Sequence, residues 1–425
     1  MFFSMRQSRK NIIELLDAEM LLTQNNSEYT NNLKIKKYDV NLHSDFNLFD
    51  KIDTKNSRIL SNDNNENEDE YDNLDNSLTL ITKENNTFET FINDISSLSC
   101  WFNSIIYKLK NSSSYVVNSF GLFLGFGSLF ICSNNKTKKD LKNFFGFQEP
   151  KYLNAGLLTM KENINNSQII IDNYLICNKN INVNKNILAE IKHLLHSIII
   201  DPRNIENETQ KVNNIINKNS GLEDVISSNT LNKSSLSLIL VSKINPIWNY
   251  KIDTITKNYY KNELTKFINF TNKTFVYFEN KDKCVIEIPM IDKSFVIGLI
   301  NYKNDVQDKF SNFDELSMCI NYLKPTIFEI VSIPTIKTRF KTRLNNILLK
   351  NGLTQIFDNY DSTFLNTVQN LEDCLQYIDI CFGTKCTNKI SKNETSSIKK
   401  FIINKQFEFY VRSIDYNCVI MMGYL

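Results

Sequence analysis

Residues 381–410 read CFGTKCTNKISKNETSSIKKFIINKQFEFY, and this stretch decides how the rest of the chain is interpreted. It begins at the end of an apolar, β-rich run, Leu375 to Phe382, and closes on a second such run, Phe407 to Val411. Gly383-Thr384 and then about fifteen polar residues, without glycine or proline, lie between the two runs. Loops longer than about 12–15 residues without their own structure are uncommon, and they are usually functional or disordered. We interpret this segment as an exposed loop that is presented to a partner as bait.

The composition is that of a globular chain. The 425 residues correspond to one large domain or two to three ordinary ones, and a hydrophobic content of 42% allows a core over most of the length. The net charge of +2 gives no argument for nucleic acid or a charged surface as partner. The heavy use of Asn, Lys and Ile is interpreted as the coding bias of an AT-rich genome rather than as chemistry.

The first 86 residues differ from the rest. Asn62 to Asp75 reads NDNNENEDEYDNLD, and so acidic a segment buries too little apolar surface to offset the entropy of ordering it. We predict that residues 1–86 form a polar, largely disordered extension and that residues 87–425 form one domain. Asn11 to Leu22 has helical periodicity, which indicates either a nascent helix without a core or a docking peptide for a partner.

Neither a secretory signal nor a membrane span is visible. Glu14, Asp17 and Glu19 interrupt the N-terminal apolar residues, and the chain has no run of eighteen apolar residues. We therefore expect no membrane association, with a cytoplasmic location as the simplest interpretation and the compartment left open. The nine cysteines are scattered, and only Cys381 and Cys386 lie close together, so separate reduced thiols are favoured over a redox pair.

Periodicity predicts helices early in the chain and strands later, an order typical of α+β folds. The expected helices cover residues 88–110, 120–132, 137–145, 184–197, 205–217 and 344–351. The expected strands cover residues 115–117, 167–177, 198–200, 235–244, 274–278, 283–290, 294–300, 326–333, 407–411 and 418–423. Asn118 or Ser119 is expected to cap the second helix, and Gly146 to end the third.

Motifs for enzymatic chemistry are missing. The sequence contains no GxSxG elbow, no HExxH and no P-loop lysine after its glycines. His43, His193 and His196 are its three histidines; the last two are three residues apart on a predicted helix, where a surface position is favoured over a metal site. We predict no catalytic residue, no metal ligand and no cofactor, and hence no enzyme.

Several short motifs in a fixed order carry a resemblance to a known family. Gly383-Thr384 is similar to a "GTEA" hinge, and Asn404 to Phe407 is similar to the "drPFlf" entry of a closing hairpin that leaves through "lFmGr", here Ile420 to Gly423. Leu238 to Trp248 is similar to the strand "LvNaiyFkg.W", with Trp248 at its tryptophan. Asn118-Ser119 stands at the place of an "SP" pair.

Over residues 88–425, this ordered set resembles the serpins, the serine protease inhibitor superfamily. The resemblance implies an α+β serpin-like fold with three β-sheets, eight or nine helices and an exposed reactive-centre loop. It also implies a mechanism: a protease cleaves the loop, and the freed strand inserts into the largest sheet and traps the acyl-enzyme. Asn118, Ser119, Trp248, Phe407 and Gly423 are then structural positions of the family.

The reactive loop departs from the family pattern at its hinge. Cys381 replaces the usual glutamate, and the run of alanines after Thr384 is replaced by Lys385, Cys386, Thr387, Asn388 and Lys389. On insertion, the period of two would turn Thr384, Cys386, Asn388 and Ile390 inward. An unpaired buried Asn388 would cost roughly 1–3 kcal/mol. We therefore expect insertion to be slowed.

The resemblance assigns the hinge to Gly383, Thr384, Lys385, Cys386, Thr387 and Asn388. It places the scissile region at Thr395, Ser396, Ser397 and Ile398. Counting forward from the hinge puts the scissile residue at Ser397, whereas counting back from Phe407 gives Thr395, so the sequence leaves the choice and the target open.

The leading hypothesis is a divergent, non-inhibitory serpin-fold protein that acts as a monomer by binding a protein. The first alternative is an intracellular suicide-substrate inhibitor of a serine or cysteine protease. The second alternative is a scaffold that recruits a partner through residues 1–86. None of the three requires nucleic acid, a membrane or a cofactor.

Overall fold

The computed structural model describes residues 70–110, 113–165, 168–232, 235–291, 293–303, 312–387 and 399–425. The acidic part of the predicted extension up to residue 69, and the amphipathic stretch within residues 11–22, lie outside this range. The proposed boundary between residues 86 and 87 falls within helix α2, Glu70–Lys110, and remains a prediction. Residues 84–425 form one compact unit, which is described below.

The described residues form an α+β fold, as expected. Its helices are α2 Glu70–Lys110, α3 Ser119–Ile131, α4 Asn135–Phe145, α5 Pro150–Ile164, α6 Lys185–Glu190, the 3₁₀ turn η2 Pro202–Asn204, α7 Ile205–Ser220, α8 Ser228–Asn232, α9 Phe313–Asn321, α10 Asn345–Lys350 and α11 Gln355–Asp358. Its strands are β1 Tyr115–Asn118, β2 Ile169–Asn178, β3 His196–Ile200, β4 Leu236–Ile244, β5 Thr254–Tyr260, β6 Glu263–Glu279, β7 Lys283–Pro289, β8 Phe295–Tyr302, β9 Lys324–Pro334, β10 Ile336–Arg343, β11 Asp373–Phe382, β12 Lys400–Ile402, β13 Glu408–Ser413 and β14 Cys418–Tyr424.

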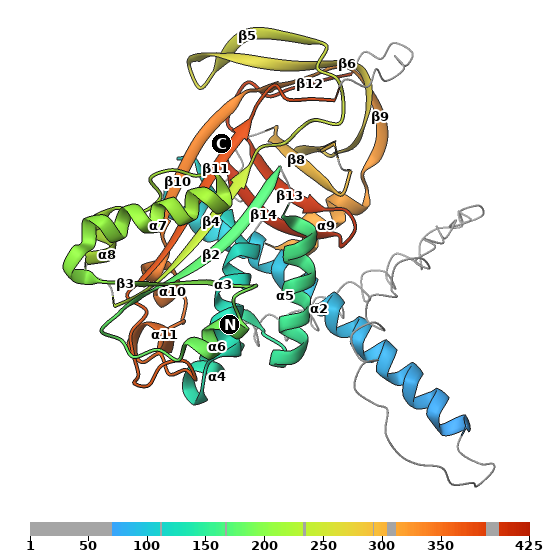
Figure 1. The fold of residues 1–425 in the computed structure, drawn as a ribbon. Coiled ribbons are helices and arrows are strands. Elements are labelled where there is room, and N and C mark those ends of the chain that lie inside the picture. The colour runs from blue at the N-terminus through green and yellow to red at the C-terminus, as the bar shows by residue number, and fades with distance from the viewer. Residues whose placement is uncertain are drawn as a thin grey trace. The chain divides into compact units, whose positions relative to one another are not determined.

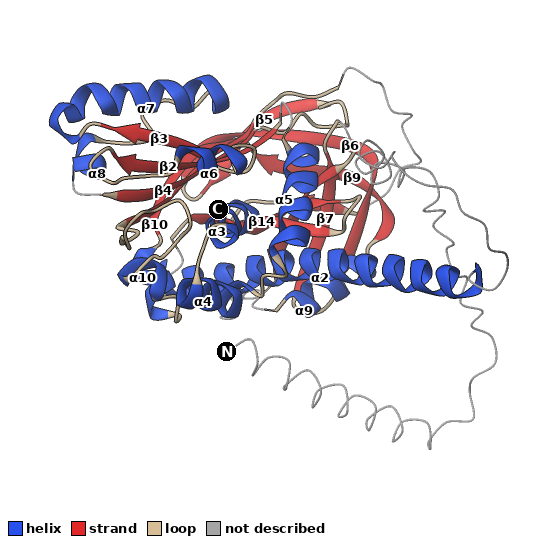
Figure 2. Cartoon of the chain, turned by 60° about the horizontal axis from the view of Figure 1, so that its bottom comes forward, coloured by secondary structure: helices blue, strands red, loops and turns tan. Residues whose placement is uncertain are grey.

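Backbone pairing joins these strands into two sheets, with helices on both sides of the strands (Figure 2). The five-stranded sheet has the order β10-β11-β4-β2-β3. The nine-stranded sheet has the order β1-β14-β13-β8-β7-β6-β9-β12, with β5 paired to β6 beside this path. The resemblance implied three sheets. Strand β6 pairs with β5 along its first part, with β9 from Phe267 to Tyr277 and with β7 at its end, so it joins two of these sheets into one.

The centre of the five-stranded sheet is a parallel pair, β4 and β11, flanked by antiparallel neighbours. We call this pair the β4–β11 seam; its register runs from Ser237 opposite Asp373 to Ile244 opposite Ile380. Both strands are almost wholly buried, which agrees with the continuous apolar run predicted for residues 235–244. Figure 1 shows β11 and β10 side by side, and β11 ends at Phe382, just before Gly383.

Helix α3 lies in the core because its sequence is apolar on every side. All residues from Ser119 to Phe130 are buried, and Gly125 lets the helix approach β4, since a Cβ there would lie 2.7 Å from a methyl group of Leu240. The predicted cap is confirmed: the Asn118 side chain accepts a hydrogen bond from the Gly121 N–H at 2.8 Å. Helix α4 ends at Gly146, as expected, with φ 76°.

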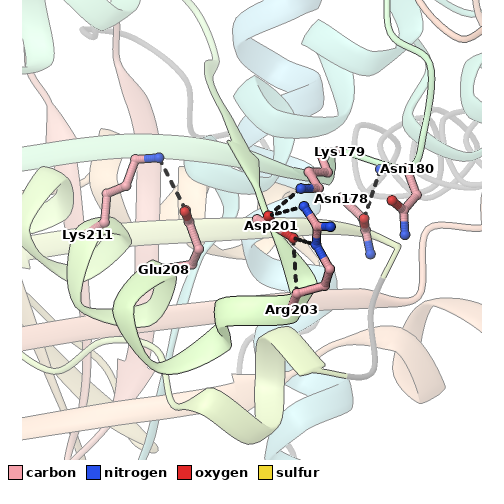
Figure 3. A network of polar contacts seen from close by, with 7 residues as sticks. All are labelled: Asn178, Lys179, Asn180, Asp201, Arg203, Glu208 and Lys211. Carbon is pink, nitrogen blue, oxygen red and sulfur yellow. Dashed lines mark hydrogen bonds and ion pairs between the residues drawn. The ribbon is translucent and has the colours of Figure 1, made fainter.

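Helix α7 packs against the face of the five-stranded sheet formed by β2, β3 and β4 (Figure 1). A polar corner precedes it, at the end of β3 (Figure 3). There, Asp201 accepts hydrogen bonds from the Arg203 guanidinium at 3.0 and 3.1 Å and pairs with Lys179 from the turn after β2. These bonds hold the pKa of the half-buried Asp201 carboxyl below its usual range. The corner thereby fixes where the chain turns from β3 into α7.

The helix predicted for residues 184–197 is wrong in its second half. Helix α6 ends at Glu190, His193 lies in a turn, and His196 belongs to β3, where it pairs with Tyr174 of β2. The strand ladder overrides the local helical periodicity. Helices α5 and α9 and strands β5, β10 and β12 were not predicted, and β6 extends ten residues or more before the expected strand at 274–278.

None of the described helices is long and apolar enough to cross a lipid bilayer.

A glycine in β8 supports a specific stability prediction. A Cβ added at Gly298 would lie 2.0 Å from Cζ of Tyr410, whose hydroxyl donates to Glu287 at 2.8 Å, so the ring has little freedom to move. We expect Gly298→Ala to lower the free energy of unfolding by about 1–3 kcal/mol in urea denaturation, because it overpacks the core.

The matched control is Gly383→Ala. Its added Cβ would meet Sγ of Cys381 at 3.5 Å, an ordinary contact, so the free energy of unfolding should change by less than about 0.5 kcal/mol. Equal losses for the two variants would contradict the packing described at Gly298.

Candidate functional site

The candidate site is the loop that follows β11, together with the two anchors that hold its ends. The anchor before the loop is formed by the hinge, residues 383–388, of which residues 383–387 are described. Three hydrogen bonds connect the hinge to Trp248. The Trp248 N–H donates to the Lys385 carbonyl at 3.0 Å, the Thr387 N–H donates to the Trp248 carbonyl at 2.9 Å, and the indole Nε1–H donates to the Gly383 carbonyl at 2.9 Å.

Trp248 is fully buried and lies at the junction of the two sheets. Its backbone forms a parallel bridge with Cys386 on one side and an antiparallel bridge with Met290, just after β7, on the other. Its ring packs edge-on against Phe382 and Phe270, with centroid distances of 6.1 and 6.4 Å. The family tryptophan inferred from the sequence therefore holds the hinge to the fold.

The hinge continues in the direction of β11 instead of folding back on it. In the β4–β11 seam, Ile380 lies opposite Ile244. Six residues later, Cys386 bridges to Trp248, which is only four residues after Ile244. The register therefore changes by two residues, and Gly383-Thr384 accommodates this change. Thr384 and Lys385 are exposed, Cys386 is half-buried against the core, and Thr387 is buried. The described hinge is thus an ordered extension of the seam.

Below the hinge, Asn118 connects both strands of the β4–β11 seam. Its side-chain Nδ2 donates to Ser242 of β4. Its backbone carbonyl accepts from Nε2 of Gln376 in β11 at 2.9 Å, and its N–H donates to Oε1 of the same side chain at 3.3 Å. Separation of β4 from β11 would break one set of these bonds, so this residue opposes opening of the seam.

The anchor after the loop is the short strand β12, which pairs in parallel with β9. The Glu329 N–H donates to the Lys399 carbonyl at 2.8 Å, and Phe401 is buried beside Tyr277. Lys399 also lies over the Tyr277 ring, with Nζ 4.2 Å from its centroid. Both ends of the loop are therefore fixed by backbone pairing to different sheets.

Glu279 provides the electrostatic part of this second anchor. Its carboxylate pairs with Lys303 at 2.7 Å and with Lys399 at 2.9 Å. Hydrogen bonds from these two ammonium groups lower the pKa of Glu279 from 4.5 to about 2. The carboxylate is therefore charged at neutral pH and holds the first residue after the loop.

The remaining sequence-predicted positions have separate structural roles. Phe407 pairs with Leu425 through two backbone hydrogen bonds of 3.0 and 2.9 Å. Gly423 allows β14 to approach β1, since a Cβ there would lie 2.7 Å from the Tyr115 carbonyl oxygen. Ser119 Oγ is buried and has no hydrogen-bond partner among the described residues. Asn388 and the predicted scissile region, Thr395, Ser396, Ser397 and Ile398, lie outside the described residues.

Other candidate chemistry does not assemble into a site. His196 lies 3.5 Å from Asp172, and His193 is in an exposed turn, so the two do not share a helix face. Within the described ranges, no three His, Cys, Asp or Glu residues are grouped as a metal would require. Cys381 and Cys386 are free thiols.

Sequence reasoning missed the partners of Asn118 at the seam. Gln376 is a polar residue within the apolar run Leu375 to Phe382, and it is 1% exposed. A buried amide in a central strand needs a hydrogen-bond partner, so its presence in that run was a signal that it contacts another element.

Known proteins share this fold and parts of this sequence. A family model described as "Serpin (serine protease inhibitor)" matches residues 100–425. The chain is 25% identical over 303 residues to the "uncharacterized serpin-like protein R700" of Acanthamoeba polyphaga mimivirus, which covers 66% of this chain and 70% of that protein.

Solved structures with a similar fold include native protease nexin-1 with heparin, maspin and human thyroxine-binding globulin. Their TM-scores are 0.70, 0.69 and 0.70, at sequence identities of 15%, 14% and 12%. The matches cover 79–80% of this chain and 98–99% of those chains. At these identities, the likeness shows the fold alone.

The hinge anchor predicts a local change in hydrogen exchange. Trp248→Phe keeps an aromatic ring against Phe382 and Phe270 but removes the Nε1–H donor to Gly383. Loss of a net contribution of about 0.5–1.5 kcal/mol should speed exchange of the Thr387 amide about 2–10-fold. Trp101→Phe, a matched change in α2, should leave that amide unaffected. Equal exchange in the three proteins would contradict the anchor.

The second anchor predicts a pH dependence of stability. Because the folded-state pKa of Glu279 lies below 4.5, its ion pairs stabilise the fold fully above that pH and are lost as the pH falls toward 2. The loss of unfolding free energy in Glu279→Gln should therefore be larger at pH 7 than at pH 3. Urea denaturation of both proteins at each pH measures this, and an equal loss at both would contradict it.

Proposed function

The chain belongs to the serpin family, and from this premise we propose that it is a non-trapping serpin, which binds a protein partner through its exposed loop and adjoining surface. The partner recognises the loop as a substrate-like segment, and a protease is one such partner. Cleavage, where it occurs, releases the protease instead of capturing it. The protein acts as a monomer and needs no cofactor or nucleic acid.

The observation that carries this proposal is the direction of the hinge. Residues 385–387 run parallel to the chain at Trp248 and are bonded to it. A strand that leaves β11 and inserts beside it must reverse direction and run antiparallel to β11. Insertion therefore requires the hinge to give up its hydrogen bonds to Trp248 before it gains any in the sheet.

The hinge side chains add to this barrier. Lys385, Cys386 and Thr387 are all larger than alanine, and they must pass between two strands that are closely packed along the β4–β11 seam. The bonds from Asn118 to either Ser242 or Gln376 must also break as the seam opens. Trapping depends on insertion outpacing hydrolysis of the acyl-enzyme, so each of these costs favours release.

A suicide-substrate inhibitor is the second candidate, and one observation favours it. The β4–β11 seam is a parallel pair between antiparallel pairs, and parallel pairing is slightly less stable per residue. One strand inserted there would be antiparallel to both neighbours and would replace the weaker pairing with two stronger ladders. The sheet itself is therefore suited to accept a strand, and the hinge decides whether it does.

Cleavage of the loop distinguishes the two functions. We expect proteases that cut within residues 388–398 to leave no SDS-resistant complex, and the melting temperature to rise by less than about 5 °C after cleavage. Insertion would add several kcal/mol of stability, and at roughly 2–4 °C per kcal/mol it would raise the melting temperature by more than about 10 °C.

The matched variant replaces Lys385, Cys386, Thr387 and Asn388 with alanine. It lacks the large hinge side chains, so the same cleavage should produce the large rise in melting temperature. An SDS-resistant complex formed by the wild-type chain, or an equally large rise in wild type and variant, would reject the non-trapping function and support the inhibitor.

A further inference from the structure

The hairpin formed by β5 and the first part of β6 is a second surface that the loop function does not use. It turns at Lys261-Asn262, both with positive φ (50° and 66°), between the paired residues Tyr260 and Glu263. Two positive φ values in a two-residue loop are the signature of a type I′ turn. Figure 1 shows this two-stranded ribbon at the top of the fold.

The outer edge of β5 has no strand beside it in the described parts of the chain. Within the described residues, β6 is the only strand that pairs with β5. The two residues that flank a two-residue turn are hydrogen-bonded to each other. Along an antiparallel pair of strands, hydrogen-bonded residue pairs alternate with pairs that are not hydrogen-bonded. The backbone groups of Ile255, Lys257 and Tyr259 therefore point to the outer edge, in agreement with the Tyr259 N–H, which is bonded to the Asn258 side chain rather than to β6.

The outward face of the hairpin is apolar around a basic centre. The exposed side chains of this face belong to Ile255, to the cross-strand pair Lys257–Lys266 and to the pair Tyr259–Leu264, whereas Ile268, opposite Ile255, is buried. Ile255, Tyr259 and Leu264 are 52%, 66% and 62% exposed, so large apolar groups face solvent on both sides of the lysines. Tyr260, Phe267 and Ile268 join the hairpin to the core, and the other side chains of β5 are exposed.

The two lysines are an unfavourable pair on their own. Like charges directly opposite each other across two strands are destabilising. Both lysines are exposed, and neither forms an ion pair with a carboxylate in the described parts of the chain. A carboxylate placed beside Lys257 by another molecule would relieve this repulsion, and that is a direct argument from charge for an acidic occupant.

We propose that β5 and residues 263–266 of β6 form a docking surface for an extended, acidic segment of a partner protein, which adds as a strand to the free edge of β5. Residues two apart on such a strand share a face. The segment therefore carries an acidic residue opposite Lys257 and apolar residues two positions before and after it, opposite Ile255 and Tyr259. Main-chain pairing supplies affinity, and these three side chains supply specificity.

A second copy of the chain does not meet these requirements. Strand β5 reads TITKNYY and contains no carboxylate. A two-fold antiparallel pairing centred on Lys257 would place Lys257 opposite its own copy and add to the repulsion. Strand β5 of a second copy is therefore not the occupant, and the surface is independent of whether the reactive loop inserts.

A displayed library of random twelve-residue peptides, selected on the immobilised full chain, tests the proposal. We expect the selected peptides to share an acidic residue flanked at two positions on either side by apolar residues. Synthetic versions, measured by fluorescence anisotropy, should bind at least tenfold more weakly when the acidic residue is replaced by lysine.

Charge reversal on the protein gives the matched test. Lys257→Glu should weaken binding of the acidic peptides at least tenfold and improve binding of their lysine versions. Because it places opposite charges across the Lys257–Lys266 pair, it should leave the melting temperature equal or higher, which separates lost binding from lost folding. Lys139→Glu, an exposed lysine in α4, should change neither. Selection without this pattern, or binding that Lys257→Glu does not change, would overturn the docking surface.

Discussion

The contact between Trp248 and the hinge is the interaction on which the state of this molecule depends. A single buried residue uses both its backbone groups and its indole nitrogen to hold residues 383–387, and it bridges at the same time to Met290, just after β7. The segment that follows β11 is thereby held at one point. Any rearrangement that moves the hinge must first disturb this tryptophan.

Two opposing tendencies meet at this point. The β4–β11 seam has the geometry to accept an antiparallel strand, whereas the hinge side chains and the bonds from Asn118 to Ser242 and Gln376 resist its opening. If the loop is cut, as the proposed function requires, the outcome depends on rates as much as on free energies. In that proposal, the hinge residues decide between binding and trapping.

The sequence predicted the parts of the fold in which local pattern and tertiary position agree. Helix α3, strand β4 and strand β14 are mostly apolar, and Asn118 and Gly146 mark helix ends by their own chemistry. The shared order of weak motifs over some 340 residues then identified the family. The family role assigned to Trp248 stays a prediction, and its hydrogen bonds to the hinge depend on a tertiary approach that no local pattern records.

The errors have equally physical causes. His193 and His196 fit a helical period, but pairing with β2 draws the second of them into β3. Strand β5 has almost no buried side chain, so its sequence lacks the apolar alternation that marks a strand. Strand β10 does alternate, yet its charged residues and the preceding Pro334 hid it. The contacts of Gln376 at the seam depend on the tertiary structure, and no local sequence pattern indicates which residues form them.

The strand order of the nine-stranded sheet also constrains how the polypeptide folds during synthesis. Strand β1 is made early and lies at the end of that sheet, and among the described strands it pairs only with β14, about 300 residues later in the chain. During synthesis, β1 therefore stays without its partner strand until nearly all of the remaining chain has been translated. Contacts this distant in sequence slow folding, and an unpaired strand edge invites association with other chains. Protection of the nascent chain over that interval is therefore a requirement built into the topology.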